Sequence, residues 1–158
     1  MPRDDSPPDT SIAPVGAADV EDVRAFLTAN DLTVAGLGTP GVRLWVVRDV
    51  AGSVVASTGF ETSSDGRHAL LRSVAVGPQR RGSGAGGRLA IFAMEQAVST
   101  GADRAWLFSR RSGPFWQGLG FRPADRETLA AVLADTSQVA LFRRTGQLGR
   151  EVAWSRPL

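Results

Sequence analysis

The sequence predicts a single α/β domain, and three observations lead to that prediction. With 158 residues, of which 42% are hydrophobic and 22% charged, the chain suits one soluble domain with a real core. Strand-like segments alternate with segments of helical spacing, which is the mixture expected of an α/β fold. No internal repeat or linker interrupts residues 11–158, so these form the domain, while residues 1–10, rich in Pro and Asp, are predicted to be a disordered tail.

The first half of the chain is predicted to form one helix and a meander of strands. Val20, Val23 and Leu27 recur at helical spacing, and acidic residues in the first turn suit the helix dipole. The apolar segments that follow are separated by short turns, which favours antiparallel strands joined by hairpins. In order, the predicted elements are a strand at 10–15, a helix at 17–31 and strands at 42–50, 53–61 and 68–76.

The second half is predicted to combine helices with two more strands. The segment after the glycine-rich run places Leu89, Phe92 and Ala93 on one face, and Gly101 stops the helix. In a later short helix Ser112 can serve as the N-cap, because a serine oxygen accepts a hydrogen bond from a free amide. The predicted elements are helices at 86–100, 112–120 and 125–136 and strands at 102–109 and 150–155.

Composition argues against several classes of protein. All 18 basic residues are arginine and they are spread along the chain, so the net charge of +2 does not indicate a surface for nucleic acid. No apolar run approaches the roughly 20 residues of a membrane helix, and the N-terminal residues lack the apolar segment of a secretory signal, so a cytoplasmic protein is expected. The absence of cysteine excludes disulfides, thiolate metal sites and a cysteine nucleophile, and no metal is expected.

The run VAVGPQRRGSGAGGRLA, residues 74–90, is the strongest candidate for a binding site. Free amides at the start of a helix favour an anion, glycines allow close approach, and an arginine adds a charged contact, so a diphosphate cradle is one interpretation. Gly82, Gly84 and Gly87 also satisfy a dinucleotide fingerprint, but five residues separate them from the strand. A P-loop requires lysine, which is absent, and a turn that binds nothing needs fewer glycines.

Two motifs resemble those of the GNAT N-acetyltransferases. Val74–Val76, Pro78 and the run Arg81–Gly86 are similar to the acetyl-CoA motif R-x-x-G-x-G/A of that family. The segment FWQGLGF, residues 115–121, is similar to its later aromatic-x-x-x-Gly-Phe motif, and the two occur in the expected order. The resemblance implies the GNAT fold, in which a mixed central sheet of about six to seven strands has an antiparallel N-terminal meander and flanking helices.

The resemblance also implies that acetyl-CoA is the co-substrate and that an amine attacks its thioester directly. Val74, Ala75 and Val76 are expected to lie along the pantetheine arm, with the backbone of Val74 and Val76 pairing with it. The acceptor is expected to be a small amino-acid-like amine with an anionic group, and a homodimer is left open. The diphosphate is expected to lie on Arg81, Gly82, Ser83, Gly84, Ala85, Gly86 and Gly87.

The second motif departs from the family where many members have a tyrosine acid. This chain has Trp116 there and no tyrosine anywhere, and an indole N–H donates a hydrogen bond but cannot supply a proton. Glu61, at the end of a strand, and His68, the only histidine, are the candidate catalytic bases. For both residues the alternative interpretation is an exposed turn residue.

Arg72, Ser109 and Trp116 are the predicted contacts of the acceptor. Arg72 lies within an apolar strand, so it either reads a substrate anion or forms an internal ion pair. The donor to the leaving thiolate is water, a serine such as Ser109 or Ser112, or none at all. Arg110 and Arg111, which follow Ser109, are further candidates for reading an anion.

The sequence is compatible with more than one function. An N-acetyltransferase is the first, and a catalytically silent domain of the same family that binds CoA or acyl-CoA as a sensor is the second. Acetylation of peptide N-termini is a third. The segments ALLRSVAV and GFE also resemble the subgroup of arsenic-resistance N-acetyltransferase 2-like proteins, although Ser109–Arg111 stands where that subgroup usually has a threonine run.

Overall fold

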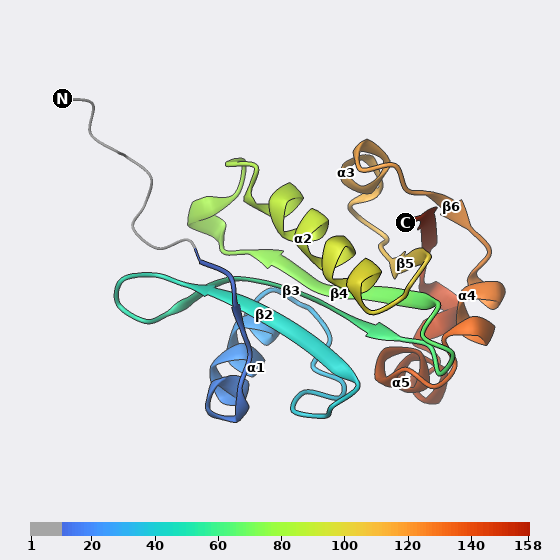
Figure 1. Cartoon of the computed structure of the whole chain (residues 1–158), viewed down its shortest axis with the longest axis horizontal. Coiled ribbons are helices and arrows are strands. Elements are labelled where there is room, and N and C mark those ends of the chain that lie inside the picture. The colour runs from blue at the N-terminus through green and yellow to red at the C-terminus, as the bar shows by residue number, and fades with distance from the viewer. Residues whose placement is uncertain (1–10) are drawn as a thin grey trace.

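A seven-stranded sheet forms the centre of the molecule, and helices cover both of its faces (Figure 1). The structure is a computed structural model that describes residues 11–158, so the predicted tail lies outside the described residues. The strands are β1 Ala13–Pro14, β2 Val42–Arg48, β3 Val54–Thr62, β4 His68–Val76, β5 Arg104–Phe108, β6 Arg122–Ala124 and β7 Ala153–Pro157. The helices are α1 Val20–Ala29, α2 Ala85–Ser99, α3 Gly113–Gly118, α4 Arg126–Val132 and α5 Ser137–Thr145, with short 3₁₀ helices at η1 Ala17–Asp19, η2 Pro78–Arg80 and η3 Gln147–Arg150.

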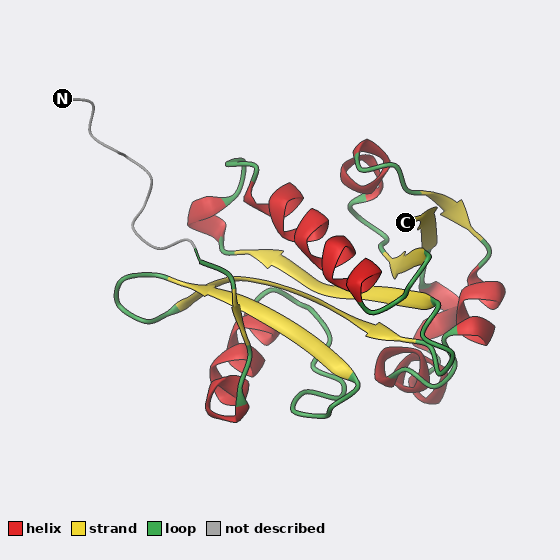
Figure 2. Ribbon diagram, in the orientation of Figure 1, coloured by secondary structure: helices red, strands yellow, loops and turns green. Residues whose placement is uncertain are grey.

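The sheet is mixed, as the sequence predicts. Its strands follow the order β1-β2-β3-β4-β5-β7-β6. The first four form an antiparallel meander, β4 and β5 are parallel, and β5, β7 and β6 are antiparallel. A parallel pair needs a crossover connection, and α2 provides it over one face of the sheet (Figure 2). Among residues 11–158, the one parallel pair therefore lies in the middle of the sheet, and the glycine-rich run and α2 connect its two strands.

Each face of the sheet has its own layer of helices. On one face, Val23 and Leu27 of α1 are fully buried and pack against Leu44 and Val46 of β2. On the opposite face lies α2, which is rich in small residues that allow close approach to the strands (Figure 1). Its buried side chains are Leu89, Ala90, Ala93, Met94 and Ala97. Within residues 11–158, no helix is both long and apolar enough to cross a membrane.

The sequence-based prediction differs from the structure mainly near the C-terminus. It missed α5 and β6, and it placed the last strand at 150–155 instead of Ala153–Pro157. A signal for α5 was present, because Thr136 caps its first turn by accepting from the amide of Val139 and Gly146 ends it with a φ of 76°. Ser112 was wrong as a side-chain cap of α3: it stands at the N-cap position, but its hydroxyl accepts no hydrogen bond from the first turn.

Acid is expected to destabilise the fold in part through Asp125, which caps α4. Hydrogen bonds from the hydroxyl and then the amide of Thr128, at 2.7 and 2.8 Å, lower the pKa of this carboxyl below its ordinary value of 3.8. A lowered pKa means that the stabilisation is fully present above that ordinary value and is lost as the pH falls through the folded value. Thermal unfolding between neutral and strongly acidic pH should show a steeper acid loss in wild type than in Asp125→Asn, and parallel profiles would contradict this.

Candidate functional site

The parallel strands β4 and β5 separate near the middle of the sheet. They pair only at His68 with Arg104, Ala69 with Ala105 and Leu70 with Trp106. Beyond these pairs β4 continues to Val76 and β5 to Phe108, and their facing edges form what we call the splay. Backbone groups along an unpaired strand edge need another partner. The splay can therefore accept an extended ligand that pairs with β4 as an additional strand.

A bulge in β4 accompanies the separation from β5. The register between β3 and β4 shifts between Ser57 and Gly59, and Ser73 has a φ of 60°. This strained conformation is held by the Ser57 hydroxyl, which donates to the Ser73 carbonyl at 2.6 Å, and by Arg72 Nε, which donates to Ser73 Oγ at 3.2 Å. Because a bulge bends its strand and increases the twist, it explains why β4 leaves β5 here.

The backbone of Val74 and Val76 faces the splay. The amide of Gly77 donates to the carbonyl of Val55 in β3, at 2.8 Å. Successive residues of a strand direct their polar backbone groups to opposite edges, so those of Val76 and Val74 point away from β3. This is the orientation that pairing with a pantetheine arm requires, whereas the backbone of Ala75 points toward β3.

The glycine-rich run leads from the end of β4 into α2. Gly82 and Gly84 both have a φ of 82°, which residues with a side chain rarely adopt. Between them Ser83 is fixed by its hydroxyl, which donates to the Arg80 carbonyl at 2.6 Å. The helix begins at Ala85, and the first amides of a helix have no intrahelical partner. The loop and the helix start can therefore present several N–H groups to one anion.

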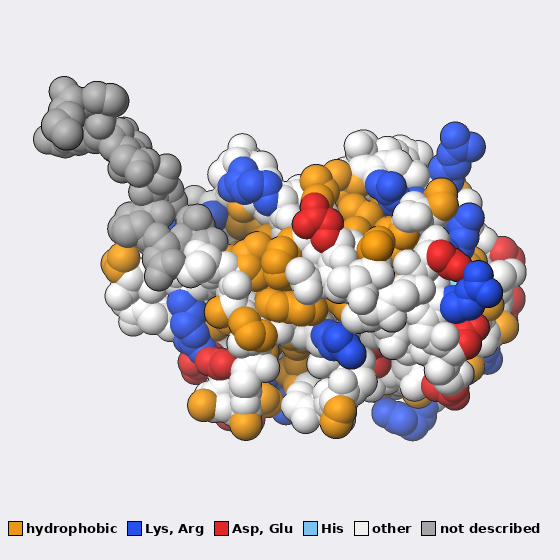
Figure 3. Space-filling model, in the orientation of Figure 1, with side chains coloured by type: hydrophobic (Ala, Val, Ile, Leu, Met, Phe, Trp, Pro, Cys, Tyr) orange, Lys and Arg blue, Asp and Glu red, His pale blue; other side chains and the backbone are white. Residues whose placement is uncertain are grey.

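The start of α2 is open toward the splay. A Cβ on Gly87 would meet nothing within 4 Å, and one on Gly86 would lie 3.7 Å from Val76 and from the ring of Phe115. The glycines thus leave room for a ligand beside the end of β4. Figure 3 shows basic side chains gathered over the loop that precedes α2, where they favour an anionic ligand.

Glu61, a predicted base, is buried in an internal network. Its side chain is 4% exposed, and its Oε2 accepts a hydrogen bond from Arg72 Nη1 at 2.9 Å. The amides of Ser137 and Gln138, at the start of α5, donate to Oε1 at 2.6 Å and to Oε2 at 3.2 Å. Because both carboxylate oxygens are engaged and covered, an amine in the splay does not reach them, and Glu61 ties α5 to β3.

Arg72 forms the internal ion pair, which is the second of its two predicted interpretations. Its side chain is 0% exposed, and besides Glu61 it contacts Ser73 and the carbonyl of Thr33, to which Nη2 donates at 3.4 Å. Burial lowers the pKa of the guanidinium below its ordinary value, and the charge of Glu61 opposes that shift. The guanidinium is thus closed to an acceptor anion and instead fixes the α1–β2 connection to the sheet.

His68, the other predicted base, lies at the paired end of β4. Its Nδ1 accepts a hydrogen bond from Trp106 Nε1 at 3.0 Å, and the two rings are in contact. Val76 lies eight residue steps along the strand from His68, which corresponds to about 26 Å. The structure therefore does not bring His68 to the open part of the splay.

The variant His68→Phe is expected to change kcat/KM by far less than the roughly 100-fold that loss of a general base costs. Its effect should fall on stability, because Trp106 loses a hydrogen-bond acceptor worth about 1 kcal/mol. Acetylation rates across the pH range and thermal unfolding test this expectation. A rate lowered by roughly 100-fold would restore His68 as the base.

The two aromatic residues of α3 have different environments. Trp116, a predicted acceptor contact, is 7% exposed and packs edge-on against Phe121, with 5.3 Å between the ring centroids. Its indole belongs to the core. Phe115 is 40% exposed and lies against the start of α2, so it is the α3 side chain that borders the candidate diphosphate site.

Ser109 directly follows β5, the strand that forms one edge of the splay. Its Oγ accepts a hydrogen bond from the amide of Ser112 at 3.1 Å, and its carbonyl accepts from Trp154 Nε1 at 2.9 Å. Within the part of the chain that the structure describes, the Ser109 hydroxyl hydrogen has no acceptor. The hydroxyl is therefore oriented by the protein and still able to donate to a ligand.

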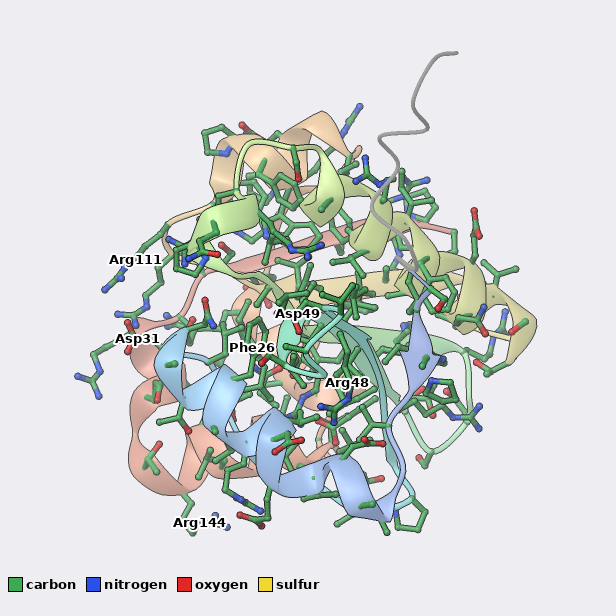
Figure 4. The ribbon with its side chains drawn as sticks, turned by 90° about the vertical axis from the view of Figure 1, so that its left-hand side faces the viewer. Phe26, Asp31, Arg48, Asp49, Arg111 and Arg144 are labelled. Carbon is green, nitrogen blue, oxygen red and sulfur yellow. The ribbon has the colours of Figure 1, made fainter. Side chains whose placement is uncertain are left out.

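The two arginines after Ser109 differ in their partners. Arg110 Nε lies 3.4 Å from Oε1 of Glu151. Arg111 is exposed and projects from the edge of the molecule in Figure 4, as does Asp31 at the end of α1. No carboxylate among residues 11–158 forms an ion pair with Arg111. Arg72, Arg110 and Arg111 were predicted to bind an anionic group. Of these three, Arg111 is the one whose charge is not paired with a carboxylate of the described residues.

Sequence reasoning missed one residue of this region, Asn30, which caps the C-terminus of α1. Its Oδ1 accepts a hydrogen bond from Nη2 of Arg81 in the glycine-rich run, at 3.2 Å. Since 51 residues separate the two, no local pattern could have connected them.

Two surface pockets lie away from the splay. One, of about 290 Å³, is lined mainly by aliphatic residues of α1, β2 and the connection between them. The other, of about 410 Å³, lies beside β1 and the end of β2. Neither includes a residue of the glycine-rich run.

Comparisons with known proteins agree with this fold. The model of the Acetyltransferase (GNAT) family matches residues 13–121. N-acetylglutamate synthase from Neisseria gonorrhoeae, complexed with coenzyme A and N-acetyl-glutamate, is similar with a TM-score of 0.68 and 15% identity, over 94% of this chain and 35% of that chain. This chain thus spans about a third of the length of that synthase.

Two further structures are similar over nearly their whole length. A GNAT-family acetyltransferase from Staphylococcus aureus Mu50 and Rv2747 from Mycobacterium tuberculosis, the latter in complex with CoA, each have a TM-score of 0.68 and 14% identity, over 94% of this chain and 99% of theirs. At these identities the similarity shows the fold. No functionally curated protein matches the chain. The resemblance to the arsenic-resistance subgroup stays a prediction.

Proposed function

Because the chain belongs to the acetyltransferase (GNAT) family, we propose that it acetylates a primary amine with acetyl-CoA as the donor. The observation that carries the proposal is the splay, in which the backbone of Val74 and Val76 faces an unpaired edge. At its open end lie the glycine-rich loop and the start of α2, with free amides and room for a diphosphate. A strand edge that leads to an anion site suits an extended ligand with a terminal diphosphate group.

In the proposed complex the pantetheine arm pairs with the backbone of Val74 and with the amide of Val76, whose carbonyl accepts from Arg81 Nε at 3.3 Å. The diphosphate accepts hydrogen bonds from amides of residues 82–87. Phe115 covers the side of the arm next to α2, since it lies beside Gly86. The thioester then lies in the open part of the splay, beyond the last β4–β5 pair and toward the end of β5, which Ser109 follows. An amine enters from the opposite side and meets the carbonyl carbon directly.

In the proposed reaction the neutral amine attacks the thioester carbonyl carbon. A C–N bond forms, the C–S bond breaks, CoA leaves as the thiolate, and the amine loses its proton to water. A thiol with a pKa of about 8.5 is an adequate leaving group without a strong acid. The Ser109 hydroxyl, oriented by the Ser112 amide, donates a hydrogen bond to the departing sulfur. Water is the proton acceptor in this scheme because Glu61 and His68 have internal partners.

The acceptor is proposed to be a small amino-acid-like amine with an anionic group. Arg111 supports this choice, because it is exposed and follows Ser109 closely in the chain. It takes the role that sequence reasoning gave to Arg72, whose guanidinium is buried. The similar gonococcal synthase is complexed with N-acetyl-glutamate, which is consistent with an acceptor of this class.

Two measurements test the proposal. Calorimetric titration with acetyl-CoA tests the donor site, and thiol release across a panel of amines tests the reaction. Each amino acid in the panel is paired with its carboxamide, so that a preference for the acid reports recognition of the anion. Arg111→Ala should remove that preference. A wild-type protein that does not bind acetyl-CoA would contradict the proposed function.

A catalytically silent domain that binds CoA or acyl-CoA is the second candidate function. It is favoured by the internal engagement of Glu61 and His68 and by the absence of tyrosine from the chain. The same measurements separate the two functions, because binding of acetyl-CoA without thiol release for any amine selects the silent domain.

A further inference from the structure

Arg81 reaches from the glycine-rich run across to the C-terminal end of α1. Its Nε donates to the carbonyl of Val76 at 3.3 Å, and its Nη2 donates to Asn30 Oδ1 at 3.2 Å. Asn30 is itself fixed, because its Nδ2 donates to the carbonyl of Phe26 at 2.8 Å. The Arg81 guanidinium is therefore held between the end of β4 and a second, distant element, although the side chain is exposed.

The oxygens that hold Arg81 are uncharged. Among the described residues, no carboxylate forms an ion pair with Arg81, so its positive charge is not compensated. A guanidinium has five N–H groups, and the two hydrogen bonds of Arg81 leave three of them for a ligand. The arginines that do form ion pairs with carboxylates are Arg24, Arg48, Arg67, Arg72, Arg110 and Arg126.

We propose that Asn30 is a positioning residue that holds Arg81 ready for the diphosphate of acetyl-CoA. The inference rests on the proposed function, and it adds a residue from outside the glycine-rich run to the donor site. A free arginine side chain loses much rotamer freedom when it is ordered on a ligand. Asn30 restricts the side chain before the ligand arrives, so less freedom is lost on binding.

The chemical type of residue 30 is central to this role. An amide oxygen orients the guanidinium and leaves its charge for the ligand. A carboxylate at the same place would orient it equally well but would compete with the diphosphate for the charge. If Asn30 acted only as the cap of α1, binding of the donor would not depend on whether residue 30 carries an amide or a carboxylate.

The inference predicts a graded effect on donor binding. Asn30→Ala should raise the Kd of acetyl-CoA about 3- to 10-fold, because Arg81 loses one of its two supports. Asn30→Asp should raise it at least about 10-fold, because the new ion pair competes with the ligand. Both variants should lower the preference for acetyl-CoA over S-acetylpantetheine, a donor that has no diphosphate. Thermal unfolding verifies that each variant is folded at the temperature of the titration.

Two further variants make the test specific. Thr28→Asp is the matched control, because it adds the same charge to an exposed position at the same end of α1, and it should change the Kd little. In an Arg81→Ala background, Asn30→Asp should have no further effect, because the residue through which Asn30 acts is gone.

The outcomes separate the inference from the proposed function. Wild-type affinity in Asn30→Asp overturns the inference, and so does an unchanged effect of Asn30→Asp in the Arg81→Ala background. In both cases wild type still binds acetyl-CoA, so the proposed function stands. A wild-type protein that does not bind acetyl-CoA overturns the proposed function and the inference with it.

Discussion

Replacing Gly84 by glutamate is expected to abolish binding of acetyl-CoA while the protein stays folded. Gly84 directly precedes α2, and a Cβ built on it lies 3.3 Å from Arg88 Nη1, in the loop proposed to hold the diphosphate. The variant introduces a side chain and a negative charge where a dianionic group should bind, and like charges in contact cost several kcal/mol. Calorimetric titration should therefore show binding at least about 100-fold weaker than wild type.

Two controls separate charge at the site from strain in the backbone. Gly84→Ala imposes the strain of a positive φ without a charge, and should weaken binding much less than Gly84→Glu. Gly66→Glu imposes both strain and charge in the β3–β4 turn, at a φ of 74° and with nothing within 4 Å of the new Cβ. It should bind acetyl-CoA as wild type does. If Gly84→Glu binds equally well, the diphosphate site lies elsewhere.

Removal of the Glu61 carboxylate is expected to lower the free energy of unfolding by about 3–5 kcal/mol. The variant Glu61→Ala leaves the guanidinium of Arg72 buried without its anion. It also removes the acceptor of the Ser137 and Gln138 amides, so the start of α5 loses its tie to β3. Chemical denaturation followed by tryptophan fluorescence measures this loss.

The matched control for Glu61→Ala removes both charges. The double variant Glu61→Leu with Arg72→Met should be more stable than Glu61→Ala, because no unpaired charge stays buried. If Glu61→Ala instead keeps its stability and loses turnover, Glu61 is a catalytic base and its assignment to the core is wrong.

The donor side of the candidate site could be predicted from the sequence because its determinants are local. Gly82 and Gly84 adopt the positive φ values that the density of glycine suggests, and a helix follows them as predicted. Backbone N–H and C=O groups alternate between the two edges of any strand. Once β4 was identified, the edge that the backbone groups of Val74 and Val76 face was therefore known. The family comparison, over residues 13–121, agrees with the resemblance that these motifs indicated.

The roles of individual side chains could not be predicted in the same way. Glu61 and His68 were predicted to be catalytic bases and Trp116 an acceptor contact because they lie near the predicted strand ends and motifs. In the structure each has an internal partner: Arg72 and α5 for Glu61, Trp106 for His68, and Phe121 for Trp116. Sequence position indicated which elements carry these residues, but not which neighbours they meet.

The sequence by itself thus determined the mixed fold, the separation of motifs and the loop that suits a diphosphate, since these depend on backbone preferences within a few residues. Only the tertiary structure decided which charges are compensated. Glu61 meets the amide of Ser137, 76 residues later, and Arg81 meets Asn30, 51 residues earlier. Whether a charged group is neutralised inside the protein or left for a ligand depends on such distant partners, because charge and burial are properties of the space around a residue and not of its neighbours in the chain.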